Sequence, residues 1–357
     1  MTATTPAPWV GTDRTAVTGL GPLPGTDPLE AARVVAGELG AFPHLPQLPA
    51  RGPSGSSTAR SAVLLVDLHV DLQPSGWRIV DRPGLDEHRA AAALGSDLDA
   101  AEEVWDGYRG PFKVQVDGPF SLAVAVDRPR GDAVLADSGA RRDVAASLTE
   151  GLLVHVGDIR RRIPGASPVV QIDEPLLSTV LAGGVPTSSG FGRLRAVTDA
   201  EVRETFRRLA DALAPVPLVV SVGARVAAPS PDELPSTLLW SALDGAGLSG
   251  FGVDPAALGT ADLDRLAALV ESGVTPWLAS VRTGSVPGGP AQRPDAVARA
   301  VVDLWDRLGF LASTAAADMV VTPDAGLAAL SPAEARRVMS LLARVGPAVA
   351  EEAATRS

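Results

Sequence analysis

Two adjacent carboxylates, Asp173 and Glu174, occupy the most chemically suggestive position in this sequence. They directly follow a short run rich in β-branched residues, Pro168–Ile172, and Pro175 then ends the strand that this run predicts. In a parallel sheet both carboxylates would lie at the carboxyl end of the strand, the edge where α/β proteins bind ligands. Carboxylates there can bind an ammonium group, a metal ion or a substrate hydroxyl. The competing interpretation is structural, a helix N-cap with a salt bridge to an arginine.

Other polar residues could join them at the same edge. Asp254 and Asp324 each follow a further apolar run. With Asp173 and Glu174 they could offer oxygen ligands to a hard cation such as magnesium, although solvated or capping carboxylates would give the same pattern. Arg51 could hold a carboxylate or a phosphate through a bidentate contact, or form a structural salt bridge.

The apolar runs alternate with longer amphipathic segments, which predicts parallel β-α-β units. The expected strands are Ala16–Leu20, Lys113–Val116, Pro168–Ile172, Pro217–Val222, Gly250–Val253, Thr275–Val281 and Asp318–Val321. The expected helices cover about 27–40, 85–105, 136–162, 199–213, 261–272, 294–308 and 332–349. An eighth strand around His44–Leu48 is weakened by its prolines, and His44 within it is a candidate functional residue. About eight units fit a (β/α)8 TIM barrel, whose site lies at the carboxyl ends of the strands.

The domain organisation follows from this alternation. Residues 1–13, rich in Thr, Ala and Pro, are expected to form a flexible tail, and 14–357 a single barrel domain. Two inserted loops interrupt it. The segment 49–85 is expected to carry a helix and a hairpin beside the barrel. The Gly- and Ser-rich segment 182–198 follows the fourth strand, where a mobile lid would lie.

Composition excludes several classes of function. The net charge of −11 argues against a nucleic-acid partner. The sequence has no stretch of about 18 apolar residues, so no membrane span is expected. It also has no basic N-terminal segment followed by an apolar run, so no signal peptide is expected. We therefore expect a cytoplasmic protein. The chain contains no cysteine, so it has no disulfide, thiolate nucleophile or thiolate metal ligand.

Four segments in register resemble the catalytic C-terminal barrel of the cobalamin-independent methionine synthases, in particular its short actinobacterial type. They are Gly19–Thr26, Leu45–Gly52, Gln171–Pro175 and Val321–Leu327. The resemblance covers roughly residues 15–350. It implies a barrel of the methionine synthase/uroporphyrinogen decarboxylase kind. It also implies methyl transfer from a methyl-folate to the homocysteine thiol, the 5-methyltetrahydropteroyltriglutamate-homocysteine S-methyltransferase reaction.

Members of that family bind zinc through a histidine, two cysteines and a carboxylate. At the former metal-ligand positions this chain has Ser221, Gly223 and Ala325, and only the carboxylate Asp254 is retained. One carboxylate does not hold zinc, because zinc sites need three or four protein ligands. The resemblance therefore predicts a degenerate zinc site, and no metal or other cofactor is expected.

The expected function is that of a methionine synthase-like barrel that is altered or inactive toward homocysteine. Asp173, Glu174 and Arg51 are the expected substrate-binding residues. The ligand would be a small molecule such as an amino acid or a thioether, its ammonium held by Asp173, since few cations compete nearby. The alternatives are an active methyltransferase that needs no cysteine, a non-catalytic barrel that binds a metabolite or partner, and a metal-free enzyme of the decarboxylase-related branch. The mouth is expected to bring together Pro22, Asp173, Ser221, Asp254 and Ala325.

Overall fold

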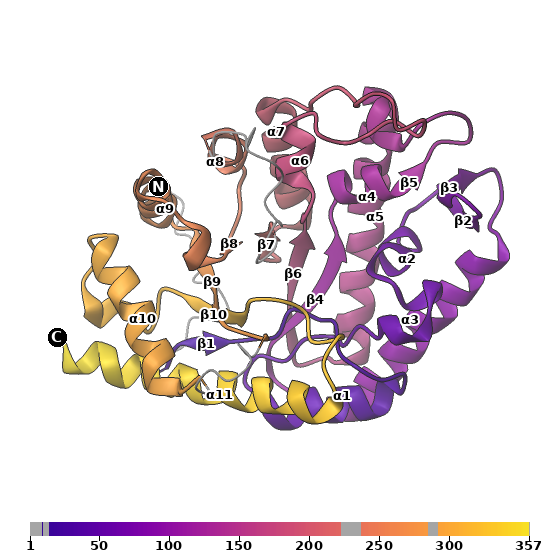
Figure 1. The fold of residues 1–357 in the computed structure, drawn as a ribbon. Coiled ribbons are helices and arrows are strands. Elements are labelled where there is room, and N and C mark those ends of the chain that lie inside the picture. Colours follow the sequence, from indigo (N-terminus) through magenta and orange to yellow (C-terminus); the bar gives the residue numbers. More distant parts are fainter. Residues whose placement is uncertain (1–8, 10–13, 223–236, 285–291, 357) are drawn as a thin grey trace.

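The computed structural model describes residue 9 and residues 14–222, 237–284 and 292–356. Its main element is a curled, parallel, seven-stranded sheet (Figure 1) with the strand order β1-β10-β9-β8-β7-β6-β4. The strands are β1 Ala16–Val17, β4 Gly110–Asp117, β6 Ala166–Asp173, β7 Leu218–Ser221, β8 Gly250–Val253, β9 Thr275–Val281 and β10 Val320–Pro323. All seven strands expected from the apolar runs are confirmed, although β1 is shorter than predicted.

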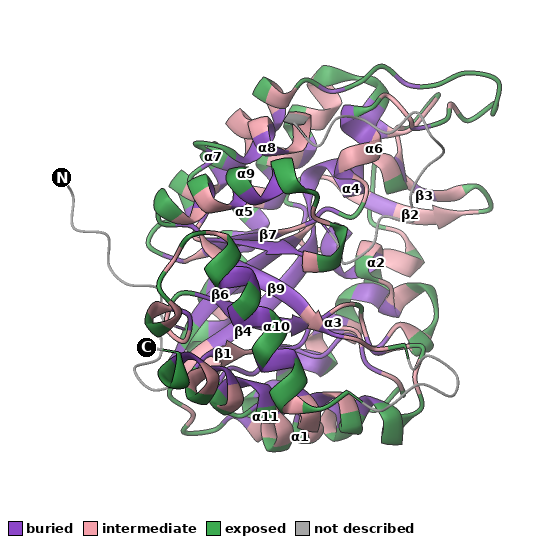
Figure 2. Ribbon diagram, turned by 60° about the vertical axis from the view of Figure 1, so that its left-hand side comes forward, coloured by how far each residue is buried: buried purple, intermediate pink, exposed green. Residues whose placement is uncertain are grey.

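The helices lie on the outside of this sheet and expose their outer faces (Figure 2). Each of the seven predicted helical segments contains a helix close to the expected bounds. The longer helices are α1 Pro28–Glu38, α3 Leu85–Val104, α5 Ser138–Arg162, α7 Asp199–Leu213, α9 Thr260–Glu271, α10 Pro294–Arg307 and α11 Pro332–Thr355. Asp27 caps α1 by accepting hydrogen bonds from two backbone N–H groups, and Ser331 with Glu334 forms a capping box at the start of α11.

The segment 49–85 contains a helix and a hairpin, as expected. The helix is α2 Ser57–Ala62. The hairpin strands β2 His69–Gln73 and β3 Gly76–Val80 pair antiparallel, and β5 Val126–Asp127 joins β3 in a second, three-stranded sheet. The remaining short elements are η1 Pro49–Arg51, η2 Pro53–Gly55, α4 Pro119–Ala125, η3 Val134–Ala136, α6 Leu177–Leu181, α8 Thr237–Leu243, η4 Pro255–Ala257 and η5 Ala312–Thr314.

The segment around His44, expected as a weak eighth strand, forms isolated bridges instead of a regular strand. His44 pairs in parallel with Lys113 of β4, and Gln47 pairs in parallel with Pro22, downstream of β1. The backbone N–H of Leu45 donates to the carbonyl of Lys113 at 2.8 Å. The described strands thus form a curled parallel sheet, and a closed barrel of eight β-α units stays a prediction.

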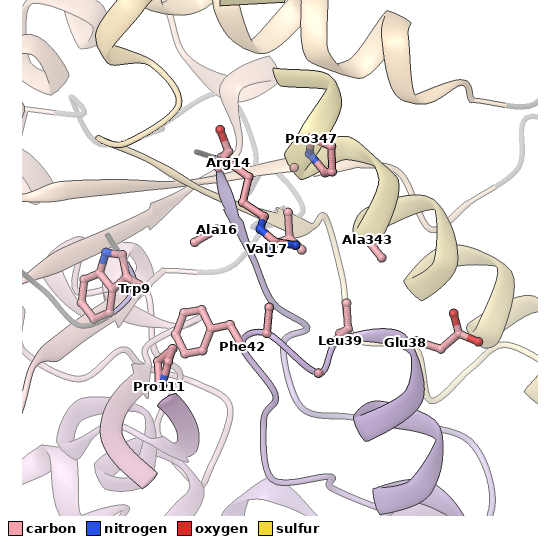
Figure 3. A pocket seen from close by; sticks show the side chains of 14 residues that line it. Trp9, Arg14, Ala16, Val17, Glu38, Leu39, Phe42, Pro111, Ala343 and Pro347 are labelled. Atoms are coloured by element: carbon pink, nitrogen blue, oxygen red, sulfur yellow. The ribbon is translucent and has the colours of Figure 1, made fainter. Parts of the chain in front are cut away.

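An aromatic cluster fills the sheet interior near the amino ends of the strands. The Trp9 ring stacks on Phe42 with centroids 6.2 Å apart and meets Trp277 edge-on at 5.4 Å. Trp9, the one described residue of the segment 1–13, is 3% exposed; the other residues of that segment lie outside the described part of the chain, so the flexible tail stays a prediction. Beside it lies a pocket of about 330 Å³ lined in part by Arg14 and Glu38 (Figure 3). Within the described part of the chain, no helix is long and apolar enough to cross a membrane.

Candidate functional site

A row of polar side chains lines the inner face of β4 and β6. Alternate residues of a strand face opposite sides of the sheet. In β4 the apolar residues Val114 and Val116 belong to the core beneath the helices. The residues between and beside them are buried and polar: Lys113, Gln115 and Asp117. The parallel register with β6 places Lys113 beside Val169, Gln115 beside Gln171, and Asp117 beside Asp173.

Lys113, the only lysine of the chain, is the first residue of this row along β4. Its side chain is fully buried, its Nζ donates to Oε1 of Gln171 at 2.5 Å, and it lies 5.9 Å from the centroid of the Trp277 ring. The amide Nε2 of Gln171 in turn donates to Oδ1 of Asp173 at 2.6 Å. Gln171 therefore connects an amine to a carboxylate.

Burial shifts both ends of this connection toward their neutral forms. It raises the pKa of Asp173, while the charge of Lys113 pulls that pKa down. Burial likewise lowers the pKa of Lys113, and the charge of Asp173 opposes the shift. The expectation that few cations compete for Asp173 is therefore wrong, because Lys113 is such a cation. The sequence did not indicate that the side chain of Lys113 lies inside the curled sheet.

A second carboxylate, Asp117, ends β4 next to Asp173. Its Oδ2 accepts hydrogen bonds from Ser57 Oγ at 3.2 Å and Thr58 Oγ1 at 3.0 Å, both in the first turn of α2. Burial raises its pKa against these bonds. The charge of Lys113 acts on Asp173, whereas Asp117 is held by the hydroxyl groups of α2. Asp173 is the more accessible carboxylate, being half-buried.

Glu174 has different partners from those expected of a substrate-binding residue. Its carboxylate is fully buried and accepts from Phe120 N at 2.9 Å, Ser121 N at 2.8 Å and Ser121 Oγ at 2.7 Å. These donors belong to the first turn of α4, whose N–H groups have no partners within the helix. Burial raises the pKa of Glu174 to about 8 against these hydrogen bonds. The geometry is that of a helix cap, which matches the structural interpretation of this carboxylate rather than a substrate-binding role.

Arg51 is also engaged within the protein. Its Nη2 donates to both carboxylate oxygens of Asp97 in α3 at 2.7 Å, and Arg60 binds the same carboxylate. Asp97 is 3% exposed. The bidentate contact predicted for Arg51 therefore exists, but with a buried carboxylate of the protein, which matches the salt-bridge alternative.

The former metal-ligand positions do not form a set of zinc ligands. Both oxygens of Asp254 bind the guanidinium of Arg282 at 2.9 Å. Ser221 offers only a hydroxyl and Ala325, which is exposed, offers no side-chain ligand; Gly223 lies outside the described residues. Within the described residues, no group of three or more His, Cys, Asp or Glu side chains could hold a metal ion. The described residues at these positions therefore supply no set of zinc ligands, and the absence of a metal ion stays a prediction.

Of the five residues expected at the mouth, Ser221 lines a small cavity near the carboxyl ends of the strands, and the convergence of all five stays a prediction. This cavity has a volume of about 10 Å³, and its wall also includes Gln171, Trp277 and Thr322. This volume is about that of one water molecule. The Pro22 and Ala325 segments lie together at another part of the edge, where Leu327 N donates to the carbonyl of Pro22 at 2.8 Å.

His44 is 1% exposed, and neither ring nitrogen has a hydrogen-bond partner among the described residues. Burial, and secondarily the charge of Lys113, lower its pKa well below the usual value. A Cβ on Gly19 would come within 2.4 Å of the imidazole, so glycine is what permits this packing. His44 is therefore a neutral packed residue rather than an exposed acid or base.

Comparisons with known proteins inform the fold and not the activity. No family model and no curated protein sequence matches the chain. A B12-independent methionine synthase from Shewanella sp. W3-18-1, solved with selenomethionine, is similar in structure. It has a TM-score of 0.61 at 10% identity over 96% of this chain and 98% of that one. A β-mannanase from the blue mussel Mytilus edulis matches with a TM-score of 0.42 at 10% identity over 92% of both chains.

At these identities the likeness shows the fold alone. The chain has a mixed α/β fold with a curled parallel sheet of the TIM-barrel kind. Within that class its fold is methionine synthase-like.

Proposed function

We propose that this chain is a methionine synthase-like barrel that binds a small amine-bearing molecule without zinc. The ligand would be an amino acid or a thioether derivative of one, held at the carboxyl ends of β4 and β6. In this proposal the bridged segment 43–47 completes a closed (β/α)8 barrel, and the homocysteine methyl transfer of the resembling family is altered or absent.

The observation that carries the proposal is that two carboxylates at this edge lie near one basic side chain. Asp117 and Asp173 are neighbours in register, and among the described residues Lys113 is the basic side chain whose charge acts on Asp173. Gln171 binds Oδ1 of Asp173, whereas Oδ2 accepts no hydrogen bond among the described residues. An ammonium group reaching the half-buried carboxylate from solvent could bind Oδ2. A charge-assisted hydrogen bond of this kind contributes about 1.5–3 kcal/mol.

Calorimetry with amino acids and their thioether derivatives tests the proposal. Asp173→Asn is expected to weaken binding by about tenfold or more, since about 1.4 kcal/mol corresponds to a factor of ten. The double variant Lys113→Met/Asp173→Asn should bind as weakly, although it leaves no unpaired buried charge. Asp264→Asn, on the exposed face of α9, is the matched control and should bind like the wild type.

Lys113→Met gives a second readout. Removing Lys113 takes away the charge that lowers the pKa of Asp173, so amine binding to this variant should strengthen as pH rises and Asp173 gives up its proton. No detectable binding to the wild type, or equal binding to Asp173→Asn in its folded state, would refute the proposal and leave Asp173 as the internal partner of Lys113.

A further inference from the structure

The carboxyl ends of β8, β9 and β10 meet around one guanidinium. Arg282 follows β9 and binds Asp254, after β8, through two hydrogen bonds of 2.9 Å. Its Nη1 also reaches Oδ2 of Asp324, after β10, at 3.4 Å. Arg282 thus joins three neighbouring strand ends through two carboxylates.

Both carboxylates are withdrawn from solvent. The side chain of Asp254 is 4% exposed and that of Asp324 14% exposed, against 34% for Arg282. Asp254 Oδ1 accepts a further hydrogen bond from Ala256 N at 2.9 Å. Asp324 Oδ1 accepts from Thr283 N and Thr283 Oγ1, each at 2.8 Å. Every one of the four carboxylate oxygens therefore has a donor.

Two buried carboxylates at one edge need a positive charge between them, because like charges in a region of low dielectric constant repel strongly. Proteins commonly supply that charge as a metal ion held by oxygen ligands. Here the guanidinium fills the same electrostatic role. Its planar fork matches the two oxygens of Asp254, a geometry that a lysine ammonium does not reproduce.

We propose that Arg282 is a built-in cation that takes the place of a divalent metal ion between Asp254 and Asp324. The wild-type edge then excludes metal ions because its carboxylates are already neutralised. Removing the guanidinium leaves two carboxylates and the Thr283 hydroxyl, an all-oxygen set suited to a hard divalent cation. This proposal is independent of the amine-binding function, because Lys113 and Asp173 lie on other strands.

Manganese(II) binding to Arg282→Ala tests the proposal. Calorimetry and electron paramagnetic resonance should find about one bound ion per chain in this variant and none in the wild type at the same concentration. The melting temperature of Arg282→Ala should rise by at least about 2 °C on adding manganese, because a ligand that binds only the folded state stabilises it. The wild-type melting temperature should stay unchanged.

The matched control is Arg162→Ala. Arg162 also binds several carboxylates, those of Asp99, Glu102 and Asp158, but Asp99 and Glu102 are exposed. Its removal should therefore create no manganese site. Equal manganese binding by the wild type, equal binding by Arg162→Ala, or a folded Arg282→Ala that binds no manganese would overturn the proposal.

A further variant covers the case in which Arg282→Ala does not fold. Arg282→Ala/Asp254→Asn removes one of the two charges that the guanidinium separates. It should be more stable than Arg282→Ala and should bind manganese at least tenfold more weakly than any folded Arg282→Ala. A double variant no more stable than the single one would show that Arg282 does not act through charge neutralisation.

Discussion

Removing Lys113 or Asp173 separately should destabilise the protein, with opposite dependences on pH. Lys113 is fully buried and connects through Gln171 to Asp173. Removing one member of a buried charged pair typically costs about 3–5 kcal/mol, because the other member is left without a counter-charge. We expect Lys113→Met and Asp173→Asn each to lower the free energy of unfolding by about this amount near neutral pH.

The pH dependence identifies the cause of the loss. In Lys113→Met the charge that lowers the pKa of Asp173 is gone, so that pKa rises further above its unfolded value of about 3.9. The folded state then holds a proton that the unfolded state releases, and stability falls as pH rises above about 4. In Asp173→Asn the pKa of Lys113 lies further below its unfolded value of about 10.4. The unfolded state binds the extra proton there, so stability rises with pH up to about 10.

The assay is equilibrium urea unfolding followed by circular dichroism, from about pH 5 to pH 9, on the wild type, both single variants and the double variant. The double variant removes both charges, so it should be more stable than the sum of the single losses implies, with a coupling energy of about 1–3 kcal/mol. Additive losses, or pH slopes of the same sign in the two single variants, would refute the interpretation of Lys113 and Asp173 as a coupled pair.

Three further predictions concern zinc, Glu174 and Trp9. After dialysis against a chelator, elemental analysis should find far less than one zinc per chain; a stoichiometric ion would contradict the description of the former ligand positions. Glu174→Gln should cost about 1–3 kcal/mol in urea unfolding, because Phe120 N and Ser121 N donate to different oxygens of Glu174 and the amide NH₂ that replaces one of them cannot accept a hydrogen bond. It should also abolish the fall in stability with rising pH between about 4.5 and 8 that follows from a folded pKa of about 8. Trp9→Ala should cost about 3–5 kcal/mol, whereas Phe191→Ala, at a side chain 99% exposed, should change stability by less than about 0.5 kcal/mol.

The positions of the strands could be predicted because their signals are local. An apolar run bounded by proline or glycine identifies a buried strand, and the runs at Gly250–Val253 and Thr275–Val281 match β8 and β9 residue for residue. The contacts of Trp9 could not be predicted in this way. Its partners Phe42 and Trp277 come from distant parts of the chain, and only the packing of the sheet brings them together.

The sequence indicated which carboxylates lie at the strand ends, but not which basic side chains pair with them. Asp173 and Asp254 lie at strand ends, as the runs before them indicated. Their cationic partners, Lys113 and Arg282, lie on or beside neighbouring strands, and sequence order does not show which side chains meet across a sheet. One signal was available: in Lys113–Asp117 polar residues alternate with Val114 and Val116, the pattern of a strand whose inner face is polar.

The two internal cations share a physical origin and differ in their consequences. A carboxylate at the edge of a mostly apolar interior needs a donor or a positive charge, whether or not a ligand is present. Arg282 meets that need for Asp254 by covering both of its oxygens. Lys113 meets it only in part for Asp173, acting through Gln171 on one oxygen of a half-buried carboxylate. The edge near β8 and β10 is therefore closed to an external cation, whereas the edge near β4 and β6 keeps an accessible carboxylate. Ligand binding by this chain should accordingly depend on Asp173 and be insensitive to added metal ions.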